Sequence, residues 1–360
     1  MGSTRFRRNR HLIAGIGAIA LVATACGSSS SSSGSTTSAA PASSASSATP
    51  ATAAASPSTT AASTENDQGV TVRFEGADGT GVADLAIADG SMAKALSPLG
   101  AKATTVGNFT ALAPAVEALQ AGALDIANGS ITATFGSLSG GADLEIFAYG
   151  ADSAQDEAIL VKASSSIKTV ADLSGKTVAV NKGGTGEYLL DQALSYNHVA
   201  ISSVKKVYLL APAGNTAFQA GSVDAWSTFA TFIPLATQND NARVLVYGGQ
   251  VDSQNDTDYV VGTSFAQAHP HLLKVVYGAL AAEESKIIAD PSTYDAALAK
   301  ADHFAVAEQK FENAALSPIR PVQAAQVALF QQVATFFQQS GGFAKPVTVA
   351  GKTIDVTTLP

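Results

Sequence analysis

The same short pattern, Gln-Ala-Gly followed three residues later by Asp, occurs twice in this chain, at residues 120–125 and 219–224. A helical stretch precedes each copy and a short apolar strand follows it. Each copy also closes the same order of strand, glycine-bearing turn, helix, strand and helix, beginning near residue 70 and again near residue 176. Alternating strands and helices are typical of parallel α/β architecture. The repetition therefore predicts two α/β lobes with related topology.

The expected elements can be placed on the sequence. The first round has strands at 70–74, 103–106, 124–127 and 145–149 and helices at 82–96 and 112–120, and the second has strands at 177–180, 204–210, 223–226 and 243–247 and helices at 187–195 and 215–219. Two extended segments, 156–161 and 258–263, are expected to cross between the lobes and form a hinge. Because open α/β sheets bind ligands at the carboxyl ends of their strands, we expect the site in a cleft between the lobes.

The first 26 residues predict export. Four arginines between Arg5 and Arg10 precede the uncharged apolar run 12–25, the order of a secretory signal. The run is too short to span a membrane, which takes about 20 apolar residues. The segment 21–26 resembles the lipobox of bacterial lipoproteins, which implies that residues 1–25 are a signal peptide and that Cys26 carries a lipid anchor. The alternative is an ordinary secretory signal with an unmodified cysteine.

Residues 26–69 are expected to be a disordered tether. They consist largely of Ser, Thr, Ala, Gly and Pro, so burial cannot offset the entropy of ordering them. Without the signal peptide, 17 basic residues stand against 29 acidic ones, a net charge of −12. This acidic balance argues against a nucleic-acid partner. We assign 70–158 to the first lobe, 159–252 to the second, 253–348 to a helix-rich return to the first, and 349–360 to a C-terminal tail.

The folded region resembles a known family. Residues 70–348 are similar to the solute-binding proteins of ABC importers for aliphatic sulfonates, nitrate and taurine. The likeness lies in the stretches 157–161, 166–176, 180–183, 188–190, 218–226, 265–270 and 345–347. It implies an α/β type II periplasmic-binding-protein fold, with two lobes joined by a two-segment hinge.

The resemblance also implies a function. We expect a monomeric, non-enzymatic protein without a cofactor, held at the outer face of the cytoplasmic membrane, that delivers a small organic anion or zwitterion to an ABC permease. An aliphatic sulfonate or taurine is the expected ligand. The alternatives are nitrate or bicarbonate, a vitamin-precursor heterocycle, or an enzyme built on the same fold.

The family's ligand-capturing loops suggest which residues bind. The turn 182–187 precedes a helix, whose N-terminus favours an anion, and its glycines allow close approach to the backbone. A plain helix-capping turn is the alternative for 182–187, and a core position is the alternative for Trp226. The candidate ligand-binding residues are Asp78, Gly79, Thr80, Asn108, Gly129 and Ser130 in the first lobe, and Gly183, Gly184, Thr185, Gly186, Glu187, Trp226 and Ser227 in the second.

Glu187 is a departure from the family. These proteins often have a histidine at its position, and a carboxylate in an anion site would repel the ligand. With Asp78 opposite, Glu187 suggests a ligand that carries an amino group as well as an anion. Metal binding and catalysis have little support, because His269 and His271 lack an accompanying cysteine or acidic cluster and no Gly-x-Ser-x-Gly elbow is present.

Overall fold

The structure, a computed structural model, describes residues 66–77, 81–109, 111–151, 153–292, 295 and 316–360. The expected signal peptide, Cys26, nearly all of the tether and residues 78–80 lie outside the described residues. The described residues all belong to one compact unit of the chain. Within the described part, no helix is both long and apolar enough to cross a membrane.

The first lobe is built on a six-stranded sheet of order β11-β4-β10-β3-β1-β2. Its strands are β1 (Thr71–Glu75), β2 (Lys102–Val106), β3 (Ile126–Ser130), β4 (Leu144–Gly150), β10 (Thr257–Gly262) and β11 (Arg320–Pro321). β1 pairs in parallel with β2 and β3, whereas β10 runs antiparallel between β3 and β4. Apolar side chains alternate between the two faces of the sheet, so that both faces are covered.

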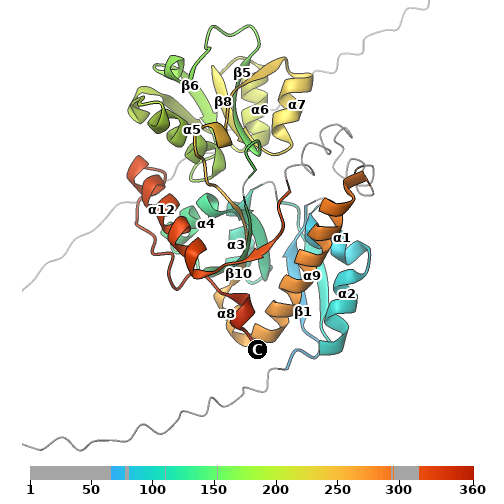
Figure 1. The fold of residues 1–360 in the computed structure, drawn as a ribbon. Coiled ribbons are helices and arrows are strands. Elements are labelled where there is room, and N and C mark those ends of the chain that lie inside the picture. Colours follow the sequence, from blue (N-terminus) through green and yellow to red (C-terminus); the bar gives the residue numbers. More distant parts are fainter. Residues whose placement is uncertain (1–65, 78–80, 110, 152, 293–294, 296–315) are drawn as a thin grey trace, which may run out of the picture. The chain divides into compact units, whose positions relative to one another are not determined.

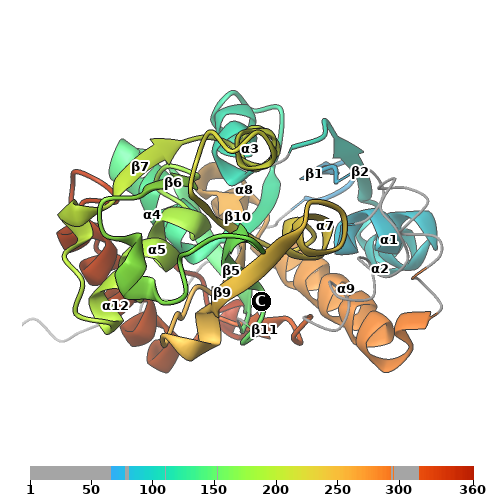
Figure 2. The same cartoon turned by 90° about the horizontal axis from the view of Figure 1, so that it is seen from above.

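Different helices cover the two faces of this sheet, as Figures 1 and 2 show. One face packs against α1 (Val82–Ala88), α2 (Ser91–Leu96) and α9 (Pro270–Ala289), and the other against α3 (Leu112–Gln120), α4 (Ile131–Gly140) and α12 (Ala324–Ser340). α8 (Thr263–Ala268) follows β10. The helix expected over 82–96 is two helices, because Gly90 adopts a left-handed φ of 82° between them.

The second lobe has a five-stranded sheet of order β7-β6-β8-β5-β9. Its strands are β5 (Glu157–Lys162), β6 (Thr177–Val180), β7 (Lys205–Tyr208), β8 (Ala225–Phe229) and β9 (Ala242–Tyr247), and its helices are α5 (Thr185–Tyr196), α6 (Ala211–Gln219) and α7 (Phe232–Asn239). Short 3-10 turns lie at Ser97–Leu99, Val170–Leu173, Ile201–Ser203, Gly248–Gln250 and Val356–Thr358. α5 packs on one face of the sheet, and α6 and α7 on the other.

The aspartate of the repeat accepts an equivalent hydrogen bond in both lobes. Asp125 accepts a hydrogen bond from the backbone N–H of Arg73 at 2.8 Å, and Asp224 accepts one from that of Thr177, also at 2.8 Å. Both acceptors precede the third strand of a lobe, and both donors belong to the first strand, Arg73 at its middle and Thr177 at its start. The glycines of the repeat, Gly122 and Gly221, have φ angles of 69° and 70°. In each lobe, the repeat therefore closes a helix and fastens the start of the third strand to the first strand. This agrees with the prediction of two lobes with related topology.

At each crossing between the lobes, the chain enters the next sheet through a strand that runs antiparallel to both of its neighbours. β5 enters the second sheet beside β8, and β10 enters the first sheet beside β3. The first connection lies between Gly150 and Glu157, and the second between Gln250 and Thr257. The expected hinge segments, 156–161 and 258–263, lie slightly too far along the chain, because both are buried strands within one sheet.

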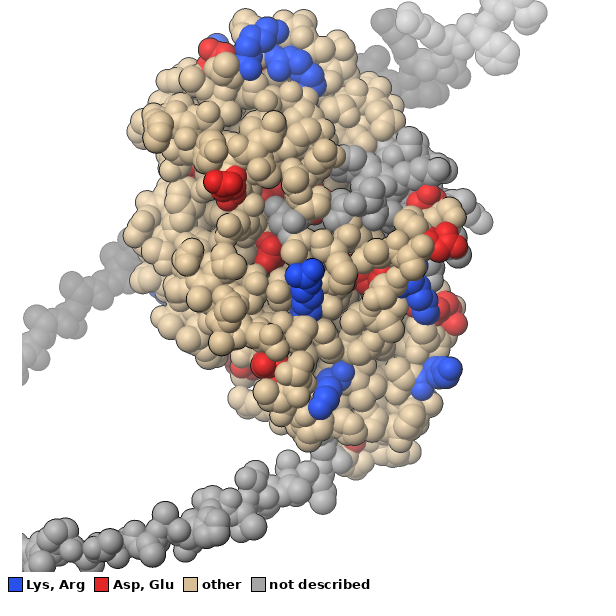
Figure 3. Space-filling view, in the orientation of Figure 1, with Lys and Arg blue, Asp and Glu red and all other residues tan. Residues whose placement is uncertain are grey.

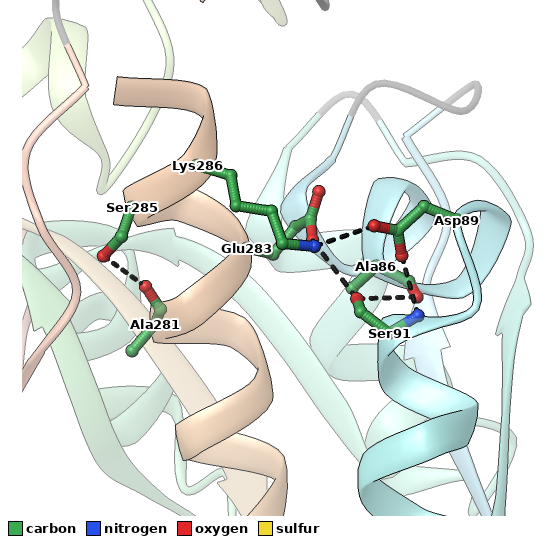
Figure 4. A network of polar contacts seen from close by, with 7 residues as sticks. All are labelled: Ala86, Asp89, Ser91, Ala281, Glu283, Ser285 and Lys286. Carbon is green, nitrogen blue, oxygen red and sulfur yellow. Dashed lines mark hydrogen bonds and ion pairs between the residues drawn. The ribbon is translucent and has the colours of Figure 1, made fainter. Parts of the chain in front are cut away.

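The return to the first lobe is helix-rich, as expected, and charged side chains fasten it. Lys286 of α9 lies 2.8 Å from Asp89 and 2.5 Å from Glu283, and the Ser91 hydroxyl lies 3.2 Å from Glu283 (Figure 4). The buried Glu283 carboxylate is thus paired and hydrogen-bonded, which offsets its desolvation. The expected C-terminal tail is also packed: Val349 and Val356 are fully buried.

Candidate functional site

A cavity of about 1070 Å³ lies where strand ends of the two lobes meet. Residues at or just past the ends of β1, β3, β6 and β8 line it, including Glu75, Ser130, Asn181 and Ala230. Proteins with open α/β sheets commonly bind their ligands at this position. The cavity volume lies slightly above the usual range for small-molecule sites, about 300–1,000 Å³. The cavity is therefore the candidate binding site.

Two hydroxyl groups, one from each lobe, meet at this cavity. The Ser130 Oγ and Thr185 Oγ1 atoms lie 3.0 Å apart. Ser130 is the N-cap residue of the ten-residue helix α4, and Thr185 is the first residue of the twelve-residue helix α5. Two helix N-termini therefore point toward one region of the cavity wall, where their dipoles favour a negative group. Lys182 and Lys345 also line the cavity.

The loop before α5 is held by its own side chains. Asn181 Oδ1 accepts a hydrogen bond from the backbone N–H of Gly186 at 2.7 Å. A Cβ atom on Gly184 would overlap the Asn181 side chain, and one on Gly136 of α4 would lie 2.8 Å from the carbonyl oxygen of Gly183. Glycine at position 136 therefore lets α4 and the loop of the opposite lobe approach closely, and glycine at position 184 leaves room for the Asn181 side chain within the loop.

Glu187 does not face the cavity, contrary to the expectation from sequence. Its carboxylate is 1% exposed and accepts hydrogen bonds from the backbone N–H of Gly183 at 2.8 Å, Lys206 Nζ at 2.9 Å and Tyr208 Oη at 2.9 Å. Burial and the hydrogen bond to Glu187 raise the pKa of Tyr208 to about 12. Lys206 neutralises the carboxylate behind the loop, so Glu187 braces the loop and does not line the cavity.

Lys206 also binds a second buried acid. Its Nζ lies 2.7 and 2.8 Å from the two carboxylate oxygens of Asp191, whose side chain is fully buried. Burial raises the pKa of Asp191 to about 6, against the opposing attraction of Lys206. One lysine thus supports two buried carboxylates directly beneath the N-terminus of α5.

Of the other predicted ligand-binding residues, some line the cavity and others lie in the core. Asn108, Gly129, Ser130, Gly183, Gly184 and Thr185 line the cavity, and residues 78–80 lie outside the described part of the chain. Trp226 and Ser227 are 2% and 1% exposed and are not lining residues, and Gly186 packs against Ser227. The Trp226 ring lies 5.8 Å from that of Phe232. The strand expected over 223–226 ends too early: β8 continues to Phe229, so that Ala230 and Thr231 occupy the strand end.

Sequence reasoning missed Glu75 and Glu284 as residues of the cavity wall, which also contains the acids Asp156 and Glu157. Burial raises the pKa of Glu75 and that of Glu284 to about 8. Tyr259 lines the cavity near them, and its pKa is raised well above the usual value by burial and by both carboxylates. Glu75 directly follows an expected strand, a position that could have signalled a role. Glu284 lies within a long helix, where nothing in the sequence shows which face meets the cavity.

Charged side chains on the face shown in Figure 3 are scattered and of both signs, with wide uncharged areas between them. The described residues contain no cluster of three or more His, Cys, Asp and Glu side chains arranged to hold a metal ion. On this face the described residues form no charged patch that marks a binding site, so the candidate ligand-binding groups are the polar ones that line the cavity.

The two lobes, their crossing segments and the cavity at the strand ends define the type II periplasmic-binding-protein fold, as predicted. The family described as "NMT1/THI5 like" matches residues 110–294, and the chain belongs to that family. Its sequence is 29% identical over 237 residues to an Escherichia coli (strain K12) protein named as an aliphatic sulfonates-binding protein. The match covers 65% of this chain and 74% of that protein.

Two solved structures have a similar fold. The alkanesulfonate-binding protein SsuA from Xanthomonas axonopodis pv. citri, bound to MOPS, superposes with a TM-score of 0.73 at 24% identity, covering 80% of this chain and 99% of that one. The periplasmic aliphatic sulphonate binding protein SsuA from Escherichia coli superposes with a TM-score of 0.71 at 26% identity, covering 78% and 91%. The fold and the family likeness expected from the sequence are confirmed.

Proposed function

We propose that this protein is the extracytoplasmic solute-binding component of an ABC importer and binds an aliphatic sulfonate or a related small organic anion without altering it chemically. The observation that carries the proposal is the pair of hydroxyls, Ser130 and Thr185, that meet in the cavity at two helix N-termini. The relatives named as sulfonate-binding proteins support it.

The cavity has the parts that an organosulfonate needs. The two hydroxyls donate hydrogen bonds to the sulfonate oxygens, and the dipoles of α4 and α5 stabilise its charge. Lys182 and Lys345 add positive charge to the wall. Apolar side chains such as Phe109 and Leu112 receive the organic part. Because the hydroxyls come from different lobes, one anion binds both lobes at once and favours their closed arrangement.

The location and the partner follow from the proposed function. The signal-like N-terminus and Cys26 support lipid anchoring at the outer face of the cytoplasmic membrane, with the tether holding the lobes away from the bilayer. An ABC permease is the proposed partner, and the protein is proposed to deliver its ligand as a monomer. Cargo delivery requires no chemical step and no cofactor, so the proposal includes neither.

The test is a binding panel with the purified protein. Butanesulfonate, taurine, nitrate, bicarbonate and an aminopyrimidine vitamin precursor are compared by thermal shift and calorimetry. A sulfonate at a hundredfold excess over its Kd is expected to add about 2.7 kcal/mol of stability. Thr185→Val is expected to weaken that binding roughly tenfold or more, because a hydrogen bond to a charged group contributes about 1.5–3 kcal/mol.

The alternatives have distinct outcomes in the same panel. Binding of nitrate, bicarbonate or the heterocycle alone would contradict the sulfonate assignment. Mass spectrometry of the recovered ligand tests the enzyme alternative: an unchanged mass agrees with a binding protein, and a converted ligand contradicts it.

A further inference from the structure

The acids Glu75 and Glu284 form a second polar region of the cavity wall. Glu75 ends β1, and Glu284 lies on α9, which packs on the β1 face of the sheet. Tyr259 of β10 is close enough to both for their charges to raise its pKa. Three elements distant in sequence thus bring two carboxyls and a phenol to one part of the cavity.

Each carboxyl has one buried oxygen without a partner, on a Glu284 side chain that is buried and a Glu75 side chain that is half-buried. Glu284 is 5% exposed, and Oε2 of Glu284 and Oε2 of Glu75 have no hydrogen-bond partner among the described residues. The backbone N–H of Asn128 donates to Glu75, and that of Ile319 donates to Glu284. Buried polar atoms in native proteins are nearly always satisfied, so each remaining oxygen calls for an explanation.

No neighbouring positive charge accounts for the two acids. The charged groups that act on Glu75 are Asp84 of α1 and Asp258 of β10, which are acidic themselves. No described Lys, Arg or His forms a salt bridge with Glu75 or Glu284. Two residues that line the cavity, with carboxyls that lack a cation inside the protein, are suited to a cation that arrives with the ligand.

The two polar regions are separated along the strands. Phe74 of β1 pairs in parallel with Ile126 of β3, so Glu75 lies level with Ala127. Ser130 lies three residues further along β3, roughly 10 Å at 3.3 Å per residue. Apolar side chains, among them Leu85 and Ile287, lie on the acidic side of the cavity. The wall therefore offers an anion-binding region, apolar surface, and an acidic region.

We propose that Glu75 and Glu284 form a subsite for a protonated amine or similar organic cation, so that the preferred ligand is an amine-bearing sulfonate whose two charged ends occupy opposite regions of the cavity. The anionic end of this assignment rests on the proposed function. The assignment of the cationic end depends only on the two acids. The amino group inferred from sequence is thereby assigned to acids other than Glu187.

The affinity for a cation at this subsite should depend on pH. Burial places the pKa of both carboxyls near 8 in the empty protein, with Asp84, Asp258 and Tyr259 as the neighbouring titratable groups. A bound ammonium favours the carboxylates and lowers their pKa, so binding releases protons. Affinity for the amine-bearing ligand is therefore expected to fall as the pH is lowered from 8 toward 6, by up to about tenfold per pH unit for each carboxyl that must ionise.

A matched pair of ligands tests the subsite. N-cyclohexyl-3-aminopropanesulfonate is compared by calorimetry with 4-cyclohexylbutanesulfonate, in which a methylene replaces the ammonium nitrogen. At pH 8 the wild-type protein is expected to bind the amine at least tenfold more tightly. Glu284→Gln and Glu75→Gln should each reduce that preference to threefold or less and leave the affinity for the carbon analogue unchanged or higher. Glu117→Gln, at an exposed position on α3, is the control and should keep the wild-type preference.

The outcomes separate this inference from the proposed function. Equal affinity for the two sulfonates, or an amine preference that persists in both glutamine variants, would overturn the subsite and leave sulfonate binding intact. Failure of both sulfonates, with cyclohexylammonium still binding in a Glu284-dependent way, would reject the proposed function and keep the subsite. Failure of all three ligands would reject both. Calorimetry in two buffers of different ionisation enthalpy measures proton release, and its absence at pH 7 would also overturn the cation assignment.

Discussion

Replacement of Lys206 by methionine is expected to lower the free energy of unfolding by about 3–5 kcal/mol at pH 8, because it leaves buried carboxylates without their cation. Glu187 and Asp191 are 1% and 0% exposed, and Lys206 binds both. The variant should also bind sulfonates more weakly, since Glu187 supports Gly183 in the loop that carries Thr185. Urea denaturation at pH 8 measures the loss of stability.

The pH dependence of this loss has a definite sign. Removal of Lys206 raises the pKa of Asp191 further in the folded protein, because the attraction of Lys206 opposes the effect of burial. A raised pKa in the folded state means that stability is retained at low pH and lost as the pH rises. The difference between variant and wild type should therefore be smaller at pH 5 than at pH 8. Lys205→Met is the matched control, because Lys205 is exposed and its removal should change stability by less than about 0.5 kcal/mol. A Lys206→Met loss below about 1 kcal/mol would show that the cluster is not held as described.

Substitution of Gly186 by alanine is expected to cost about 1–3 kcal/mol of stability, the usual penalty for overpacking a filled site. A Cβ atom at Gly186 would overlap the carbonyl oxygen of Ser227 and lie 2.7 Å from Asn181 Oδ1. Both neighbours are parts of the loop and strand that position α5, so the helix N-terminus must shift. Sulfonate affinity should fall at least tenfold, measured by calorimetry.

Gly278→Ala provides the comparison for this variant. Gly278 is exposed on α9, and a Cβ atom there meets nothing within 4 Å. Alanine in a helix interior is favoured over glycine by about 0.5–1 kcal/mol, so this variant should gain stability and keep its affinity. An unchanged melting temperature and unchanged affinity in Gly186→Ala would contradict the packing described around the loop.

The sequence predicted the fold well where local patterns repeat. The Gln-Ala-Gly-x-x-Asp repeat led to two related lobes, and the structure explains it through Asp125 and Asp224, which bind the first strand of each lobe. Element boundaries were less accurate. The strand expected over 223–226 continues to Phe229, and the helix expected over 82–96 breaks at Gly90. Such ends depend on tertiary pairing and on single backbone conformations that periodicity does not show.

The site was predicted in part, for physical reasons. Strand ends and glycine turns are visible in sequence, and Asn108, Ser130 and Thr185 do line the cavity. Glu187 was misplaced because its neutralising partner, Lys206, lies 19 residues away on another element. Glu284 was missed because it reaches the cavity from a helix of the returning chain, and only tertiary packing decides which face of that helix meets the cavity.

The most direct test of sulfonate binding between the lobes is a crystal structure of the protein with a bound alkanesulfonate, with the ligand sulfur located by its anomalous signal. The chain contains only two methionines and one cysteine, so few other sulfur atoms compete. We predict the sulfur within about 4 Å of both Ser130 Oγ and Thr185 Oγ1, at hydrogen-bonding range of its oxygens. A ligand sulfur beside Glu284, or outside the cavity, would contradict the account.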